Sequence, residues 1–229
     1  QLEQIFGLNS TDGFVGVLPF FHSFGFTGTL WSPAVLGVRV VYHPNPLDAK
    51  AIGPLVSQHA LTFLLATPTF LQLYMRGCSA EDFGSLRVVA TAAEKLPERL
   101  ATAFEEQFGI RPLEGYGCTE CSPAVAVNTH DFRSAGFRQI GAKRGKIGHP
   151  LPGISVRIVD PETSAPLPVG QPGLLLVRGP NIMLGYFSNP GATAEVLRDG
   201  WFSAGDLGQL TPDGRVRITS LDRSDTYHL

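Results

Sequence analysis

The regular order of short apolar runs and helical segments over residues 13–115 constrains the fold of this 229-residue chain most strongly. Runs with the length and residue types of buried strands lie at residues 13–18, 38–42, 61–66, 86–90 and 111–114. Helical features occupy the segments between them. Strands that alternate with helices predict right-handed βαβ units, and therefore a mainly parallel sheet with helices on both faces.

Four helices are expected between these strands, at residues 24–35, 49–59, 67–75 and 97–108. The first is rich in aromatic and small residues and is expected to be buried. Asp48 can cap the second helix, and Pro68 suits the first position of the third. The fourth is amphipathic, and Gly109 is expected to end it.

From about residue 123 the pattern changes to short strands divided by proline and glycine turns. Strands are expected at residues 124–128, 155–159, 173–177 and 215–219, with one helix at 191–197 and an irregular segment at 129–146. The predicted fold class is therefore α/β, with βαβ layers on a mainly parallel sheet followed by a β-rich subdomain. The expected divisions are an α/β subdomain at residues 1–122, a β-rich subdomain at 123–219, and a hinge-like tail at 220–229.

Composition excludes several classes of protein. The net charge of −2 carries no basic footprint for nucleic acid, so no nucleic-acid partner is expected. Residues 14–21 and 61–66 are the longest apolar stretches, too short to span a bilayer. Three cysteines without a secreted-scaffold spacing indicate reduced thiols. We expect a cytoplasmic protein that associates with a membrane only through a longer parent protein.

A polar, glycine-rich segment follows the last strand of the alternating part and reads Glu-Gly-Tyr-Gly-Cys-Thr-Glu over residues 114–120. Parallel sheets bind ligands outside the carboxyl ends of their strands, so this segment is expected at the binding edge. The Thr119 hydroxyl can donate to a phosphate, and the Glu120 carboxylate suits Mg²⁺, which prefers oxygen ligands. A tight turn with a capping threonine explains the same residues, so the segment alone leaves both interpretations open.

Three other positions have a binding interpretation beside a structural one. Asp206 lies in a glycine turn at residues 204–207, where its carboxylate can accept hydrogen bonds from a ribose diol or merely form the turn. The small residues Ala92 and Ala93 follow a strand and leave a slot for a flat base. His22 follows another strand end and has aromatic neighbours in the sequence. Its two interpretations are a residue in the wall of a pocket and a buried core histidine.

Five segments together resemble the adenylate-forming enzymes, the family of acyl-CoA synthetases, acyl-carrier-protein synthetases, luciferases and peptide-synthetase adenylation domains. They are residues 19–25, 91–96, 116–120, 173–186 and 200–207, in the family's order. Residues 93–96, 114–123 and 143–153 are most similar to the ligase part of bacterial acyl-acyl-carrier-protein synthetases. Ordinary fatty-acyl-CoA synthetases share much of the same pattern.

The resemblance implies a chemistry and assigns residues to it. The chain would use ATP and Mg²⁺ to activate a fatty or other carboxylic acid as an acyl-AMP, whose acyl group passes to CoA or acyl carrier protein. The implied catalytic residues are His22 beside the acyl pocket, Thr119 on the phosphate and Glu120 on the metal. The implied nucleotide contacts, for either ATP or AMP, are Ala92, Ala93, Glu94, Glu114, Gly115, Tyr116, Gly117, Asp206 on the ribose, and Arg223.

The sequence also departs from the family. The family's Ser/Thr/Gly-rich phosphate loop is expected before residue 1. Its mobile C-terminal domain, with the lysine that contacts the reacting carboxylate and the α-phosphate, is expected after residue 229. Ala204 replaces the usual threonine, and residues 220–223 differ from the usual hinge. We therefore expect an internal fragment of a ligase, incomplete for catalysis, that binds AMP or an acyl-AMP better than ATP.

Two other hypotheses remain open. The chain could be a non-catalytic AMP-binding or acyl-AMP-binding module, such as a decayed paralogue, or a domain whose motifs survive only as determinants of the fold. Substitution of Glu120 or Asp206 separates these two, because nucleotide binding falls only in the first.

Overall fold

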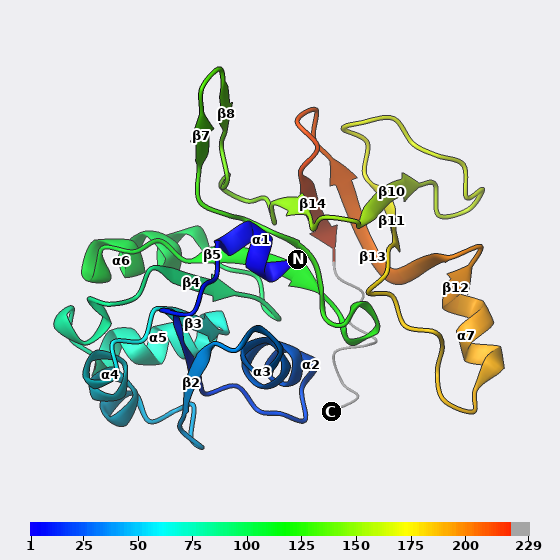
Figure 1. The fold of residues 1–229 in the computed structure, drawn as a ribbon. Coiled ribbons are helices and arrows are strands. Elements are labelled where there is room, and N and C mark those ends of the chain that lie inside the picture. The colour runs from blue at the N-terminus through cyan, green and yellow to red at the C-terminus, as the bar shows by residue number, and fades with distance from the viewer. Residues whose placement is uncertain (221–229) are drawn as a thin grey trace. The chain divides into compact units, whose positions relative to one another are not determined.

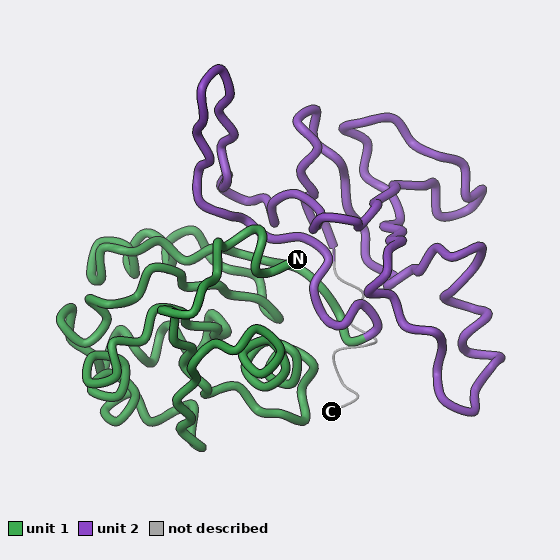
Figure 2. The backbone as a smooth tube through the Cα atoms, viewed as in Figure 1, with its two compact units in different colours: residues 1–119 green, residues 120–229 purple. Residues whose placement is uncertain are grey.

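The computed structural model describes residues 1–220. The chain forms two compact units, residues 1–119 and residues 120–229, which Figure 2 distinguishes by colour. The sequence suggested a division after residue 122, three residues farther along. The functional subdomains assigned to that division stay a prediction.

The first unit is built on parallel strands in the order β2-β1-β3-β4-β5 (Figure 1). Their bounds are β1 Gly13–Gly16, β2 Arg39–Tyr42, β3 Phe63–Ala66, β4 Val88–Thr91 and β5 Leu113–Gly117. All residues of β1, β3 and β4 are buried, as expected of parallel strands covered on both faces. The predicted α/β fold class is confirmed.

Helices connect these strands. They are α1 Leu2–Phe6, α2 Ser23–Gly25, the π-helix η1 Phe26–Trp31, α3 Ser32–Leu36, α4 Ala49–Gln58, α5 Pro68–Gly77, the 3-10 turn η2 Glu81–Phe83 and α6 Glu98–Phe108. Asp48 caps α4 by accepting a hydrogen bond from the Ala51 N–H at 3.2 Å, as predicted. Gly109 ends α6 in the left-handed conformation, with φ of 72°, which glycine adopts without a steric penalty.

The expected helix at residues 24–35 is confirmed, but the expectation that it is buried is wrong. The helical conformation continues without a break through α2, η1 and α3, with a π-helical middle, and Phe26, Trp31 and Val35 are 45%, 52% and 75% exposed. Small residues face inward instead: a Cβ on Gly28 would lie only 2.5 Å from Leu65 Cδ1. Because the close approach to β3 requires glycine, the aromatic side chains are left on the outer side.

The core of the first unit joins apolar side chains from strands and helices that are far apart in the sequence. It is formed by Val15 and Leu64 of the sheet with large aromatic and aliphatic side chains of the covering helices, including Ile52, Leu71, Tyr74, Phe83, Phe104 and Phe108. Phe83 and Phe108 have ring centroids 4.9 Å apart, and such aromatic pairs add to the stabilisation from buried area. This packing holds the strands whose carboxyl ends carry the predicted site residues.

The second unit is β-rich, as predicted. Its bounds are β6 Ala124–Val127, β7 Phe132–Ser134, β8 Phe137–Gln139, β9 His149–Pro150, β10 Ser155–Val159, β11 Gly173–Arg178, α7 Pro190–Val196, β12 Leu197–Arg198, β13 Trp201–Leu210 and β14 Val216–Ser220. An antiparallel sheet has the order β10-β11-β13-β12, with β14 also paired to β13. β6 pairs with β9, and β7 with β8, both antiparallel.

Two features of the second unit differ from expectation. The β7–β8 hairpin lies inside the segment expected to be irregular, and its six strand residues are all exposed. β13 runs through residues 204–207, which were expected to form a turn. A strand whose residues are exposed on both faces carries no apolar alternation, so the period that marks a half-buried strand is missing.

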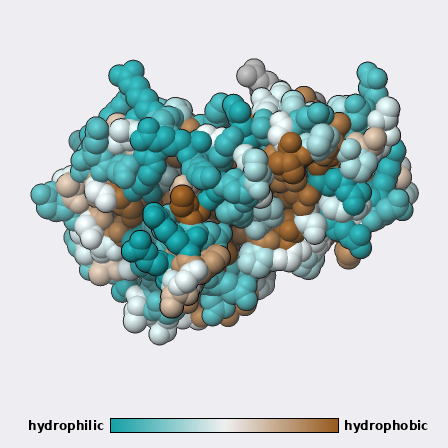
Figure 3. All heavy atoms as spheres, turned by 90° about the horizontal axis from the view of Figure 1, so that it is seen from above, coloured by the Kyte–Doolittle hydropathy of each residue, from teal (hydrophilic) through white to brown (hydrophobic). Residues whose placement is uncertain are grey.

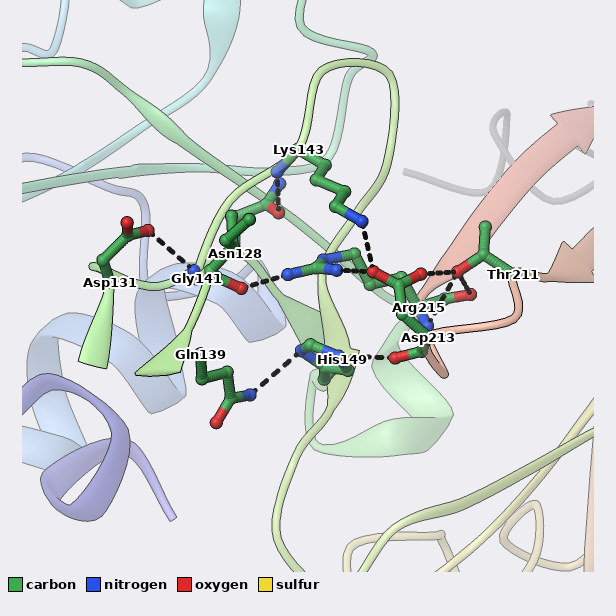
Figure 4. A network of polar contacts seen from close by, with 10 residues as sticks. Asn128, Asp131, Gln139, Gly141, Lys143, His149, Thr211, Asp213 and Arg215 are labelled. Atoms are coloured by element: carbon green, nitrogen blue, oxygen red, sulfur yellow. Dashed lines mark hydrogen bonds and ion pairs between the residues drawn. The ribbon is translucent and has the colours of Figure 1, made fainter. Parts of the chain in front are cut away.

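A network of polar contacts ties the base of the β7–β8 hairpin to the turn between β13 and β14 (Figure 4). The Lys143 Nζ lies 2.5 Å from Asp213 Oδ2, and the buried Arg215 guanidinium donates to Asp213 and to the Ile140 carbonyl. His149 donates from Nε2 to the Asp213 carbonyl at 3.0 Å. The hydrogen bond from Lys143, with the hydrogen bond from Thr211 and the charge of Arg215, holds the pKa of the Asp213 carboxyl well below its usual range.

Within residues 1–220, no helix is both long enough and apolar enough to cross a membrane. The face drawn in Figure 3 carries hydrophobic patches among a larger number of polar side chains.

Candidate functional site

Four predicted nucleotide contacts lie in a strand and not in a turn after it. β5 extends through Gly117, so Glu114, Gly115, Tyr116 and Gly117 are all part of it. The expected strand end at residue 114 is therefore wrong by three residues. The glycines weaken the propensity for strand, and β5 is paired with β4 at its start, through Ala90 with Leu113 and Thr91 with Glu114.

Thr119 begins the short 3-10 turn Thr119–Cys121 that follows β5. Its Oγ1 lies 3.2 Å from the Oγ of Ser23, which is 96 residues earlier in the chain. Ser23 directly follows His22, the predicted pocket residue. Two motifs that the sequence places far apart therefore meet at the carboxyl end of the sheet in the first unit.

His22 is the N-cap residue of α2 and is half-buried. Its Nδ1 accepts a hydrogen bond from the Phe24 N–H at 3.1 Å. A neutral imidazole whose Nδ1 accepts must carry its proton on Nε2. The cap therefore fixes both the ring and its tautomer, and leaves Nε2 as the donor.

The predicted base-binding segment follows β4. Ala92 is half-buried, and Ala93 is exposed with a φ of 71°, which is uncommon for a residue with a side chain. Glu94 is exposed, and its Oε2 accepts a hydrogen bond from the Thr69 Oγ1 at 2.7 Å. The Leu96 N–H donates to Glu114 Oε1 at 2.9 Å, which ties this segment to β5.

Burial raises the pKa of the Glu114 carboxyl, and the hydrogen bond from the Leu96 N–H opposes that shift. Thr91, which pairs with Glu114 across the two strands, is 1% exposed. Within residues 1–220 its Oγ1 has no hydrogen-bond partner. A buried hydroxyl without a hydrogen-bond partner lowers the stability of the fold.

In the second unit, Glu120 is half-buried and is held by residues that follow β11. Its carbonyl oxygen accepts a hydrogen bond from the Met183 N–H at 2.8 Å. Its Oε1 accepts one from the Tyr186 hydroxyl at 2.8 Å. Sequence reasoning singled out neither Tyr186 nor Ser23 as a site residue, although both lie within or next to segments recognised as motifs. No local pattern indicates such partners, because they are distant in sequence.

Asp206 lies inside β13 and not in a glycine turn, so the expected local structure is wrong. Between the pairs Leu174–Leu207 and Leu176–Ser203 the register of β13 against β11 shifts, and Gly205 has a φ of 78°. Bulges of this kind redirect a side chain. Asp206 is 8% exposed.

Arg223, the other predicted ribose contact, lies outside the described residues. Among residues 1–220 no group of three or more histidine, cysteine, aspartate or glutamate side chains could hold a metal ion.

Comparison with known proteins identifies the relatives of this chain. A long-chain-fatty-acid–CoA ligase of Yersinia pestis is 34% identical over 206 residues, which are 89% of this chain and 35% of the relative. A feruloyl-CoA synthase of Amycolatopsis is 35% identical over 204 residues, 87% of this chain and 39% of the relative. The chain thus spans little more than a third of the length of these relatives.

Solved structures also match most of this chain. The apo crystal structure of MatB from Rhodopseudomonas palustris superposes with a TM-score of 0.86 and 28% identity, covering 98% of this chain and 42% of MatB. The family model for AMP-binding enzymes matches residues 1–187. That match includes every predicted site residue except Asp206 and Arg223. The chain therefore belongs to the family of AMP-binding enzymes.

Proposed function

We propose that this chain carries the nucleotide site of an acid–thiol ligase, which uses ATP to activate a carboxylic acid as an acyl-AMP for transfer to a thiol. The observation that carries the proposal is the distance of 3.2 Å between Ser23 Oγ and Thr119 Oγ1. This contact joins the predicted acyl-pocket motif and the predicted phosphate motif at one edge of the parallel sheet, where such folds bind ligands. The names of the relatives as CoA ligases support the reaction class.

In this proposal the first unit binds the adenine and the α-phosphate. Thr119 donates its hydroxyl to a phosphate oxygen, while Ala92, Ala93 and Glu94 line one side of the base. The residues of β5 line the other side, with the glycines admitting the ligand to the backbone. These residues are Glu114, Gly115, Tyr116 and Gly117.

His22 would border the reacting carboxylate. Because its Nδ1 is occupied by the Phe24 N–H, the neutral ring presents an N–H from Nε2. A fixed donor at that position stabilises negative charge on the acid or the phosphate and needs no rearrangement during the reaction. Its role is positioning and electrostatic stabilisation.

Asp206 would accept hydrogen bonds from the ribose hydroxyls, and Glu120 would hold Mg²⁺. The half-buried Glu120 carboxylate fits the metal, because Mg²⁺ takes oxygen ligands and commonly binds through one or two carboxylates plus substrate phosphates. When bound, the ion would neutralise charge on the phosphates. Arg223 as a second ribose contact stays a prediction.

The acid and the acceptor are proposed from the relatives. Their names include both a fatty acid and an aromatic acid, which supports a carboxylic acid as substrate; a fatty acid is the specific proposal. CoA is the acceptor in both names. Acyl carrier protein as acceptor, the cytoplasmic location and the non-catalytic alternative stay predictions.

The test is calorimetric titration with a non-hydrolysable acyl-AMP analogue. We expect the wild type to bind it and Asp206→Ala to bind roughly tenfold or more weakly, because a buried hydrogen bond to a charged group is lost. Asp199→Asn, which makes the same change in net charge at an exposed position, is expected to bind like the wild type. Absence of binding by folded wild type would exclude the proposed site.

A further inference from the structure

A segment of the second unit braces Glu120 and the residues that follow it. Residues 181–186, which follow β11, make four hydrogen bonds to residues 120–124, about 60 positions earlier in the chain. Three of these bonds hold the backbone, and one holds the Glu120 carboxylate itself. The brace therefore fixes the peptide and the side chain separately.

The backbone bonds come from Asn181 and Met183. The two N–H groups of the Asn181 amide donate to the carbonyl oxygens of Cys121 at 2.7 Å and Ala124 at 2.8 Å, which uses both donors of that nitrogen. The Met183 N–H donates to the Glu120 carbonyl at 2.8 Å. The position of the Glu120 Cα is thus set by contacts within its own unit.

The side-chain bond comes from Tyr186, whose hydroxyl donates to Glu120 Oε1 at 2.8 Å. The tyrosine backbone is held in turn, because its N–H donates to Thr193 Oγ1 at 2.9 Å and that hydroxyl donates to the Asn189 carbonyl at 2.9 Å. The start of α7 therefore anchors Tyr186. Tyr186 is 37% exposed, so its hydroxyl is not needed to fill the core.

We propose that Tyr186 is a positioning residue for the metal ligand Glu120, an inference that rests on the proposed function. By holding Oε1 it stops rotation of the carboxylate and directs Oε2 to the metal. Mg²⁺ demands near-ideal octahedral geometry, so a freely rotating carboxylate binds it less well. Hydrogen-bond partners that orient metal ligands strengthen metal binding in this way.

A purely structural role for Tyr186 predicts something different. If the hydroxyl only stabilises the fold, its loss lowers the free energy of unfolding and leaves the effect of Mg²⁺ on nucleotide affinity unchanged. The quantity that separates the two roles is the ratio of the ATP dissociation constant in EDTA to that in saturating MgCl2. This ratio measures binding and requires no turnover.

The experiment measures that ratio by calorimetry for wild type, Tyr186→Phe, Glu120→Gln and the double variant. We expect the ratio to fall roughly tenfold in Tyr186→Phe and to fall at least as far in Glu120→Gln. In the double variant, Tyr186→Phe should cause no further fall, because the two residues act as one unit. Tyr42→Phe is the matched control, since it removes a half-exposed hydroxyl that donates to the Thr29 carbonyl.

An unchanged or increased ratio in Tyr186→Phe would overturn the inference. So would a fall in the ratio that is equally large when Tyr186→Phe is made in the wild type and in Glu120→Gln. Affinity for AMP in EDTA distinguishes this failure from failure of the proposed function. Wild type that binds AMP but shows no effect of Tyr186→Phe contradicts only the role of Tyr186. Folded wild type that binds neither AMP nor ATP contradicts both.

Discussion

Asp12 illustrates how single residues of the first unit depend on distant partners. Its carboxylate is 2% exposed. Arg87 donates to both of its oxygens, from Nε at 2.6 Å and Nη2 at 2.5 Å, and the Thr62 hydroxyl donates at 2.7 Å. The side-chain hydrogen bond from Arg87 is the largest cause of the lowering of the Asp12 pKa to about 2. No sequence pattern marks this group, because its cation is 75 residues away.

The variant Asp12→Asn tests this compensation. The substitution leaves Arg87 without its carboxylate partner, and we expect the free energy of unfolding at neutral pH to fall by about 2 kcal/mol. A fully buried ion pair would lose more, because Arg87 is partly exposed. Urea unfolding measures the change. Glu105→Gln, which breaks the exposed ion pair with Arg111, should cost less than about 1 kcal/mol.

The same variant has a defined pH dependence. The pKa of Asp12 is lower in the folded than in the unfolded chain, so its stabilisation is fully present above the ordinary value of 3.8 and is lost as pH falls toward about 2. The difference in unfolding free energy between wild type and Asp12→Asn should therefore shrink across that window. A difference that stays constant down to pH 2 would contradict the assignment.

At the scale of elements, local signals predicted where helices begin and end better than where strands end. Asp48 and Gly109 act as expected because capping depends on residues close in sequence. β5 extends beyond its predicted end, and β13 lies where no strand was predicted, because pairing with neighbouring strands overrides the low strand propensity of their glycines. Asp206 was therefore identified as a candidate residue, but its place in a bulged strand was not foreseen.

The bulge itself is testable through Gly205→Ala. Gly205 has a φ of 78°, and a Cβ in the left-handed region costs roughly 1–2 kcal/mol. We expect this loss in urea unfolding together with a fall of several-fold in affinity for the acyl-AMP analogue, because the strand redirects Asp206. Gly214→Ala has the same φ of 78° in the β13–β14 turn and should lose comparable stability without losing affinity. Equal affinities for the two variants would exclude a role for the bulge in placing Asp206.

At the scale of the whole molecule, the change from alternating strands and helices to short strands alone predicted the two kinds of architecture. Buried parallel strands appear as continuous apolar runs, so the first unit was visible in the sequence. The β7–β8 hairpin was not visible in the sequence. All of its strand residues, including Phe132 and Phe137, are exposed, so buried apolar and exposed polar positions do not alternate along it. Contacts such as Ser23 with Thr119 and Tyr186 with Glu120 exist only after folding, and the sequence could name the motifs but not their partners.

The central claim is that residues at the carboxyl ends of the strands of the first unit bind an adenine nucleotide. The most direct test is to titrate AMP into the isotopically labelled chain and follow backbone amide resonances by NMR. The account predicts saturable shifts concentrated at residues 22–23, 91–96 and 114–119. Saturable shifts confined to other parts of the chain, or none in a folded protein, would contradict it.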